Sequence, residues 1–356
     1  MPHGIDDQTV PLEEVNLLEW LLKNALITAV LVAAFIVFCG LTAVGLDLME
    51  YARQPAGKSV VGQIVQIAHG RAMSQIANDL ANAGLIHSPL KFRLLARLKG
   101  CDKSLQAGEY LLSPAMTPLE MLDALVRGKV QLHRITIPEG YNLRQIGALL
   151  DAAGLVQAAA FDAAAHDKNS AARAGIAAAS FEGYLFPDTY SFPKGTSATE
   201  IITAMKTRFD QVFKPEWRVR AEKMGWTVHQ VVTLASIIEK ETGEPAERPL
   251  ISAVFHNRLR RGMRLETDPT VIYGIPDFDG NLTRRHLATE TPYNTYRIAG
   301  LPPGPIANPG AEAIEAALYP SDSAYLFFVS RNDGTHHFSA TLAEHQQAVR
   351  RYQLGR

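Results

Sequence analysis

The stretch Val231-Val-Thr-Leu-Ala-Ser-Ile-Ile-Glu-Lys-Glu-Thr242 is an apolar run that ends in two carboxylates, Glu239 and Glu241. A helix, with about 100° per residue, places four of its apolar residues on one buried stripe: Val231, Leu234, Ala235 and Ile238. Glu239 lies on one flank of that stripe, beside the small residues Ala235 and Ser236, and Glu241 lies on the other flank. We expect this helix to organise the rest of the chain.

A carboxylate beside small residues on an apolar helix has two useful properties. A low dielectric raises its pKa, and the missing side-chain volume leaves room for a ligand. Both properties suit a general acid that protonates a glycosidic oxygen. The same pattern also fits a solvated helix end at residues 239–241. Periodicity alone does not choose between these interpretations, nor between Glu239 and Glu241.

The composition excludes several classes of protein. The chain has 356 residues, 47% of them hydrophobic, and a net charge of −1. It is therefore long enough for more than one domain and a sizeable core. It carries neither the basic excess typical of nucleic-acid binding nor an acidic tract typical of disorder. Cys39 and Cys101 lie far apart and form no CxxC motif, so we expect no disulfide.

An uncharged run over residues 25–46 is about 22 residues long, enough to cross a bilayer as a helix. A cleaved signal peptide is the alternative, but the run is too long and the flank at 1–24 is acidic. We predict a retained transmembrane helix with residues 1–24 in the cytoplasm. Lys23 precedes the span while Arg53 and Lys58 follow it, so positive residues do not favour this orientation. The orientation rests on the large downstream domain, which can translocate despite such flanks.

Short strands and helices follow a linker that we place at 47–57. The expected elements are a strand over 60–67, helices over 73–85 and 88–98, a strand over 108–112 and a helix over 117–126. Thr117-Pro-Leu-Glu120 is a capping box with proline at the first helical position. Near the end of the chain, Asn332-Asp-Gly334 predicts a hairpin turn between two strands.

One sequence pattern occurs twice. Gln75-Ile-Ala-x-x-Leu-x-x-Ala-Gly-Leu-Ile86 returns as Gln145-Ile-Gly-x-x-Leu-x-x-Ala-Gly-Leu-Val156, and the same register aligns Gly70 with Gly140 of Pro138-Glu-Gly140. The repeated pattern predicts two strand-turn-helix units with the same structure. Small modules of this sort often bind extended polymers, and they serve equally well as packing units.

Polar groups are interleaved with aromatic, proline and glycine residues in the second half of the chain. Phe181–Tyr190 holds Glu182 and Asp188 among aromatic rings, which suits sugar binding but also fits a strand and turn of the core. Residues 267–274, 293–296 and 300–310 read as rigid loops that hold three polar groups in place: Asp268, Asn294 and Tyr296. Turn-building alone also accounts for these loops.

The sequence contains no motif that supports acyl transfer, phosphoryl transfer or metal catalysis. It contains no GxSxG elbow, phosphate-binding loop or SxxK motif in a supporting context. His336, His337 and His345 lack the HExxH spacing of a zinc site, so we expect no metal. Acid–base chemistry by carboxylate remains.

Several motifs together resemble those of the MltG (YceG-like) endolytic murein transglycosylases. They occur in the family's order: Pro138–Gly140, Phe181–Tyr190, Leu234–Thr242, Asn257-Arg258, Thr267–Gly274, Asn294–Tyr296, Gly300–Gly304 and His336–Phe338. The resemblance implies an α+β protein with a single-pass inner-membrane anchor. It also implies a LysM-like small α/β module, placed at 58–131, and a mixed, mainly helical catalytic domain at 132–356, in the periplasm or outside the membrane.

The resemblance also implies a reaction. The family's catalytic residue is the first glutamate of its Glu-Lys-Glu-Thr motif, which falls on Glu239. The family cleaves the β-1,4 bond between N-acetylmuramic acid and N-acetylglucosamine without water and leaves 1,6-anhydro ends. One glutamate serves first as acid and then as base. Motif position further points to six substrate-binding residues: Glu241, Asn257, Asp268, Tyr273, Asn294 and Tyr296.

The implied partners are peptidoglycan glycan strands and the membrane, with no cofactor, metal or nucleic acid. Association with peptidoglycan synthases is an expectation from the family alone. Two alternatives stay open at this point. One is a non-catalytic peptidoglycan-binding scaffold, and the other is a muramidase, which would use water.

Overall fold

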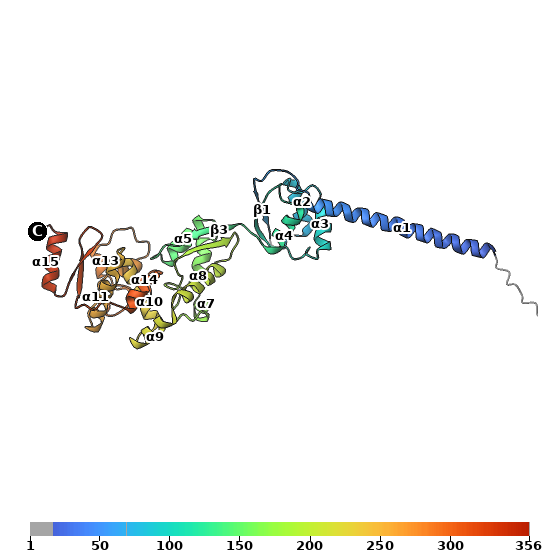
Figure 1. The fold of residues 1–356 in the computed structure, drawn as a ribbon. Coiled ribbons are helices and arrows are strands. Elements are labelled where there is room, and N and C mark those ends of the chain that lie inside the picture. Colours follow the sequence, from blue (N-terminus) through green and yellow to red (C-terminus); the bar gives the residue numbers. More distant parts are fainter. Residues whose placement is uncertain (1–16, 69, 356) are drawn as a thin grey trace, which may run out of the picture. The chain divides into compact units, whose positions relative to one another are not determined.

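The computed structural model describes residues 17–68 and 70–355, with side chains from residue 22 onward (Figure 1). Most of the predicted cytoplasmic segment, 1–24, therefore lies outside the described residues. The chain divides into two compact units, Met1–Val130 and Gln131–Arg356. Helices dominate both units, and the described strands form three antiparallel two-stranded sheets. This confirms the predicted α+β class, whereas the LysM-like character of the first unit stays a prediction.

The first helix, α1 (Leu17–Arg53), contains an apolar segment long enough to cross a membrane. It continues past the predicted end of the span at residue 46, so residues 47–53 of the predicted linker at 47–57 are helical. The helix continues because Leu48, Tyr51 and Ala52 are buried in the core of the first unit. Burial of these side chains stabilises the helix beyond residue 46, where the sequence shows only that charged residues follow the uncharged run.

The first unit is a small layered module. After α1 its elements are β1 (Gln63–Ile67), α2 (Met73–Asn82), α3 (Pro89–Leu98), β2 (Gly108–Leu112) and α4 (Pro118–Arg127). β1 pairs antiparallel with β2, with Ile67 opposite Gly108. The predicted capping box of Thr117 and Glu120 begins α4, and Gly128 ends it in the left-handed conformation.

The second unit opens with the same layout, which confirms the predicted repeat. Its first elements are β3 (Leu132–Thr136), α5 (Leu143–Ala152), α6 (Ala158–Ala165), α7 (Lys168–Arg173) and β4 (Thr189–Pro193). β3 pairs antiparallel with β4, as β1 does with β2. Gly70 and Gly140, which precede α2 and α5, have φ of 74° and 73°. A side chain is disfavoured at that φ, so both turns call for glycine.

The rest of the second unit is mainly helical. Its helices are α8 (Ala198–Val212), α9 (Pro215–Lys223), α10 (Val228–Glu241), the 3₁₀ turn η1 (Pro245–Glu247), α11 (Arg248–Arg260), α12 (Asp268–Tyr273), α13 (Arg284–Ala288), α14 (Ala311–Leu318) and α15 (Leu342–Gln353). The predicted hairpin is formed by β5 (Phe327–Ser330) and β6 (His336–Ser339). The segment 267–274, expected to be a rigid loop, contains α12, and α9 is another short helix. Proline at the first turn and buried Trp217 and Val271 favour these short helices.

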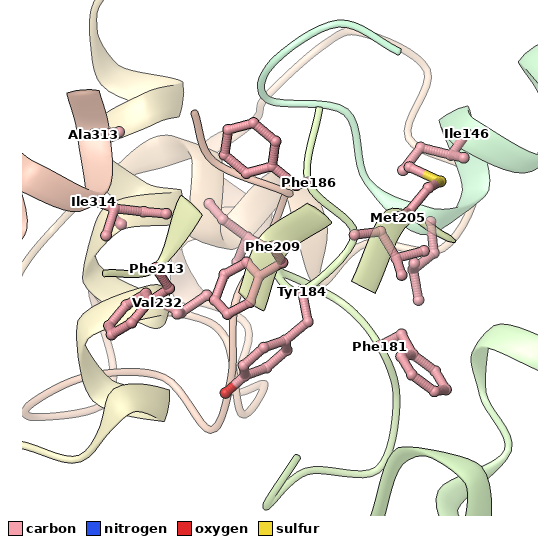
Figure 2. Packing of buried hydrophobic residues seen from close by; sticks show 14 of the residues in the cluster. Ile146, Phe181, Tyr184, Phe186, Met205, Phe209, Phe213, Val232, Ala313 and Ile314 are labelled. Carbon is pink, nitrogen blue, oxygen red and sulfur yellow. The ribbon is translucent and has the colours of Figure 1, made fainter. Parts of the chain in front are cut away.

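Helix α10 lies at the centre of the second unit and is buried on every side. All eight residues from Val231 to Ile238 are buried, so the predicted single stripe is too narrow. A helix that is apolar all round packs within a core, and here α9, α11, α12 and α14 contact it. Figure 2 shows Val232 near an aromatic row in which Phe209 lies 5.2 Å from Tyr184 and 5.6 Å from Phe213, centroid to centroid.

The repeat supplies a matched test of the two units. Leu80 and Leu150 hold equivalent positions and neither side chain is exposed. Each substitution by alanine should cost about 2–5 kcal/mol, because it leaves a cavity in a packed core. We expect Leu80→Ala to reduce amide-exchange protection in unit 1 alone and Leu150→Ala in unit 2 alone, measured by mass spectrometry on the full chain in detergent. Loss of protection in both units with either variant would contradict two separate cores.

Candidate active site

Glu239 occupies the last turn of α10, and its side chain is only 7% exposed. The backbone N–H of Gly310 donates a hydrogen bond to Oε2 over 3.0 Å. Gly310 is the residue that caps the start of α14, so this carboxyl faces the positive end of a helix dipole. The carboxyl is thus held in place from outside its own helix.

The small residues beside Glu239 pack against another loop of the protein. The sequence alone predicts instead that they leave room for a ligand. Ser236 is fully buried, and its Oγ accepts the backbone N–H of Ile306 over 3.0 Å. The loop that leads to Gly310 therefore packs directly on α10. Small side chains on this flank allow the loop to bring a hydrogen-bond donor to Glu239.

The turn at Pro138-Glu-Gly140 packs beside the same carboxylate. A β-carbon at Gly140 would lie 3.4 Å from Cγ of Glu239. Gly140 donates its N–H to the carbonyl of Asn308 over 2.9 Å, and its own carbonyl accepts from Nζ of Lys240 over 3.3 Å. A β-carbon at Gly310 would overlap the carboxylate of Glu139, with only 2.0 Å to Oε1. A side chain at 310 would therefore displace the carboxylate of Glu139 from its present position.

Arg248 lies between three carboxylates. Its Nη2 is 3.7 Å from Oε1 of Glu239 and 3.9 Å from Oε2 of Glu139, and its Nη1 pairs with Glu312. The arginine side chain is 8% exposed, while those of Glu139 and Glu312 are at least half exposed. The buried Arg248 thus lies close to the buried carboxylate of Glu239 and to the solvated carboxylates of Glu139 and Glu312.

These contacts set the protonation of Glu239. Burial is the main cause that raises the pKa of its carboxyl above the usual range, and the negative charge of Glu139 raises it further. The N–H of Gly310 and the charges of Arg248 and Lys240 act in the opposite direction. The balance favours the protonated form more than an exposed glutamate would, as a general acid requires.

A groove of about 700 Å³ lies beside this cluster. It is lined by Lys240, which follows Glu239 in the chain, by Gly140, which packs beside Glu239, by the start of α5 and by α12 with the loop after it, including Asn142, Pro269 and Tyr273. Its walls hold polar and apolar groups together, as a site for a sugar chain requires. The carboxylate cluster is therefore next to a space that can hold a substrate.

Glu182 is buried at the wall of this groove. It is 4% exposed and accepts hydrogen bonds from the N–H of Leu143 over 3.2 Å, from the hydroxyl of Tyr273 over 3.1 Å and from Nδ2 of Asn308 over 3.1 Å. Burial raises its pKa to about 8, against the effect of these donors. Glu182 connects the repeat helix α5 to α12 and to the loop that precedes Gly310.

Glu241 belongs to a separate polar cluster. Its Oε1 accepts the hydroxyl proton of Thr267, and burial raises its pKa to about 7. Nearby, the hydroxyl of Tyr296 donates to Oδ1 of Asp268 over 2.8 Å. The structure thus brings together Glu241, Asp268 and Tyr296, and places Tyr273 with Glu182 on the groove.

The two predicted asparagines are bound to backbone. Nδ2 of Asn257 donates to the carbonyls of Ser323 and Tyr325 over 2.9 and 2.8 Å. Asn294 has no exposed surface, and its Nδ2 donates to carbonyls of the segment 286–289. These contacts give both residues a role in holding loops in position, while contact with a substrate stays a prediction.

The sequence pattern assigned no site role to Glu139 or Arg248, and it linked Glu182 to sugar binding as one of two interpretations of Phe181–Tyr190. Glu139 stands in the motif Pro138–Gly140, so a signal for it was present in the sequence. Arg248 begins a helix whose arginines resemble any solvated face. Only the tertiary structure brings it to Glu239.

Comparison with known proteins matches residues 65–351 to the YceG-like family. An endolytic murein transglycosylase of Bacillus subtilis is 33% identical over 81% of this chain and 84% of its own. One from Streptococcus pneumoniae is 31% identical over 80% of this chain, which spans 57% of that longer protein. A crystal structure of a YceG-like protein from Listeria monocytogenes has a TM-score of 0.56 at 36% identity, covering 81% of this chain and 99% of that one.

The raised pKa of Glu182 predicts a pH dependence of stability. The folded state keeps its proton up to about pH 8, whereas the unfolded carboxyl loses it near 4.5. The unfolding free energy should therefore fall as the pH rises between these values, since the folded state binds more protons there. Urea titrations from pH 4 to 9 should show a weaker fall in Glu182→Gln. An identical slope in the variant would contradict the assignment, and Glu200→Gln, a surface carboxylate that caps α8, is the control.

Proposed function

The chain belongs to the YceG-like family, and we propose that it cuts murein as an endolytic transglycosylase with Glu239 as its general acid. Its relatives from Bacillus subtilis and Streptococcus pneumoniae carry this activity in their names. The observation that carries the assignment of Glu239 is its placement. It is a buried carboxyl with a raised pKa, held by Gly310 next to a groove.

In the first step Glu239 protonates the oxygen of the β-1,4 bond between N-acetylmuramic acid and N-acetylglucosamine. The bond from C1 of the muramic acid to this oxygen breaks, and the oxygen leaves as the C4 hydroxyl of the next sugar. Oε2 of Glu239 accepts the Gly310 N–H, so Oε1, which lies 3.7 Å from Nη2 of Arg248, is the oxygen proposed to carry the proton. Arg248 and the Gly310 N–H then stabilise the carboxylate that forms.

In the second step the same carboxylate acts as base. It removes the proton from the C6 hydroxyl of the muramic acid, whose oxygen attacks C1 and closes the 1,6-anhydro ring. The proton returns to Glu239, no water is consumed, and the residue is ready for the next cycle. A single essential carboxyl therefore suffices, because the nucleophile belongs to the substrate.

The groove beside Glu239 is the proposed path of the glycan strand. Tyr273 offers an aromatic face on its wall, and Lys240 and the start of α5 offer polar groups. Asp268, Tyr296 and Glu241 form the neighbouring polar cluster and are proposed to bind sugar hydroxyls. Asn257 and Asn294 contribute by holding the loops that carry these groups.

The proposed cellular arrangement starts from α1. Within the described part of the chain, one apolar helix near the N-terminus is long enough to be a membrane anchor. We place residues 1–24 in the cytoplasm, the span at 25–46, the module at 58–131 and the catalytic unit at 132–356 on the outer side of the membrane. The module is proposed to be LysM-like and to bind glycan. Association with peptidoglycan synthases, which make the nascent strands, is part of the same proposal.

Substitution at the two glutamates tests the assignment. Glu239→Gln keeps the size of the side chain and removes its proton chemistry, so turnover of purified peptidoglycan should fall by about 100-fold or more. Mass spectrometry of the fragments should show that 1,6-anhydro ends disappear with it. The matched control is Glu241→Gln, which should retain part of the activity. Loss of activity in Glu241→Gln with retention in Glu239→Gln would contradict the assignment.

The fragment ends also separate the alternatives. Reducing ends in the wild-type digest would indicate a muramidase, for which Glu139 beside Arg248 would be the second carboxylate. A wild-type chain that binds peptidoglycan and cuts none of it would indicate a scaffold.

Removal of the charge at Glu139 should change the pH profile. Protonated Glu239 is the active form, so kcat/KM falls as the pH rises through its pKa. The negative charge of Glu139 raises that pKa. Glu139→Gln should therefore shift the alkaline limb of kcat/KM to lower pH. Glu315→Gln, an exposed carboxylate one turn further along α14 from Glu312, should leave the limb unchanged, and an unchanged limb in Glu139→Gln would contradict the electrostatic role.

A further inference from the structure

Helix α3 of the first unit carries a row of exposed leucines. Leu90, Leu94 and Leu98 follow one another at four-residue spacing and are 72%, 37% and 71% exposed. The opposite face of α3, with Phe92 and Ala96, is fully buried in the core of the unit. Single exposed leucines are ordinary, but three in one row on a helix mark a surface that is covered by something outside the unit.

Basic side chains accompany this row. Arg93, Arg97 and Lys99 are exposed, and among the described residues neither arginine pairs with an acidic side chain. Both arginines line a shallow groove of about 370 Å³ together with Leu90, Leu94, Met73 and Asp102. Leucines and arginines side by side on an exposed helix are the pattern of a helix that lies in a membrane interface.

The position of α3 brings this surface to the end of the membrane-spanning segment. The hydroxyl of Tyr51 on α1 donates to the carbonyl of Ser88, which caps α3, over 3.0 Å. Nζ of Lys91 is 2.7 Å from Oδ1 of Asp47. Asp47 is the first charged residue after the uncharged run 25–46. Figure 1 shows α3 beside the point at which α1 enters the unit, so α3 begins at the level where α1 leaves the bilayer.

We propose that α3 docks on the bilayer surface, with its leucines among the acyl chains and its arginines on the phosphates of anionic lipids. The proposal rests on the proposed membrane anchoring by α1. Two observations favour lipid over another protein: the apolar row begins at the end of the span, and its basic flank complements an anionic surface. Docking holds the first unit against the membrane, so that it does not turn freely on α1.

Lipid-borne quenching tests the proposal on the full chain. In a background of Cys39→Ala and Cys101→Ala, a fluorophore is attached to Leu94→Cys and the protein is reconstituted in vesicles of phosphatidylcholine with phosphatidylglycerol and a nitroxide-labelled lipid. The matched site is Ile64→Cys, an apolar residue that is 60% exposed on β1. Figure 1 shows β1 across the unit from the entry of α1. Val37→Cys, within the span, reports anchoring.

We expect strong quenching at positions 37 and 94, at least about twofold greater at 94 than at 64. Arg93→Glu with Arg97→Glu should lower quenching at 94 and leave it unchanged at 37. Equal quenching at 94 and 64, with 37 quenched, would show an anchored protein whose α3 does not dock. No quenching at 37 would instead refute the anchor itself. Equal quenching at 94 without phosphatidylglycerol would overturn the assignment of the arginines to anionic headgroups.

Discussion

The hydrogen bond from the Gly310 N–H to Glu239 is the contact on which the catalytic unit depends. It requires the end of α10 and the start of α14 to meet, and α14 packs along α10 through buried apolar residues such as Ala313 and Ile314. Glycine at 310 leaves room beside this contact for the carboxylate of Glu139. Burial of Glu239 among the surrounding helices raises the pKa of its carboxyl, and the Gly310 N–H limits the rise together with the charges of Arg248 and Lys240. Packing and acid strength are therefore set by the same few atoms.

The repeated strand-turn-helix unit explains how the groove is formed. In the first unit the turn at Gly70 is exposed, whereas the equivalent turn at Gly140 lies against Glu239 and Lys240. The helix after it, α5, supplies an N–H to Glu182 and part of the groove wall. The first copy of the repeated unit thus belongs to a separate module near the membrane segment. The second copy contributes directly to the candidate site. The local pattern is the same, and the residues packed against it differ.

Local patterns predicted the helices and strands, and the family resemblance singled out Glu239, but neither predicted the contacts between distant segments. The repeat, the hairpin at Asn332 and the helix that carries Glu239 follow from periodicity, capping and turn residues, whereas the α+β class is what the family resemblance implies. The roles of Glu139, Glu182 and Arg248 depend on loops that meet only in the folded unit, and no spacing in the chain encodes this. The buried circumference of α10 was underestimated for the same reason, because Val232 and Ile237 meet neighbours that sequence does not reveal. The end of α1 was misplaced because burial of Tyr51 extends it.

The central claim is that Glu239 delivers its proton to a glycan bound in the adjacent groove. The most direct test is a crystal structure of the extramembrane part, or a cryo-EM structure of the full chain, carrying Glu239→Gln with a peptidoglycan tetrasaccharide. The account predicts that a glycosidic oxygen lies within about 3 Å of the substituted side chain, with the C6 hydroxyl of the muramic acid on the same side. A strand bound instead against Glu241, with its glycosidic oxygens far from residue 239, would contradict it.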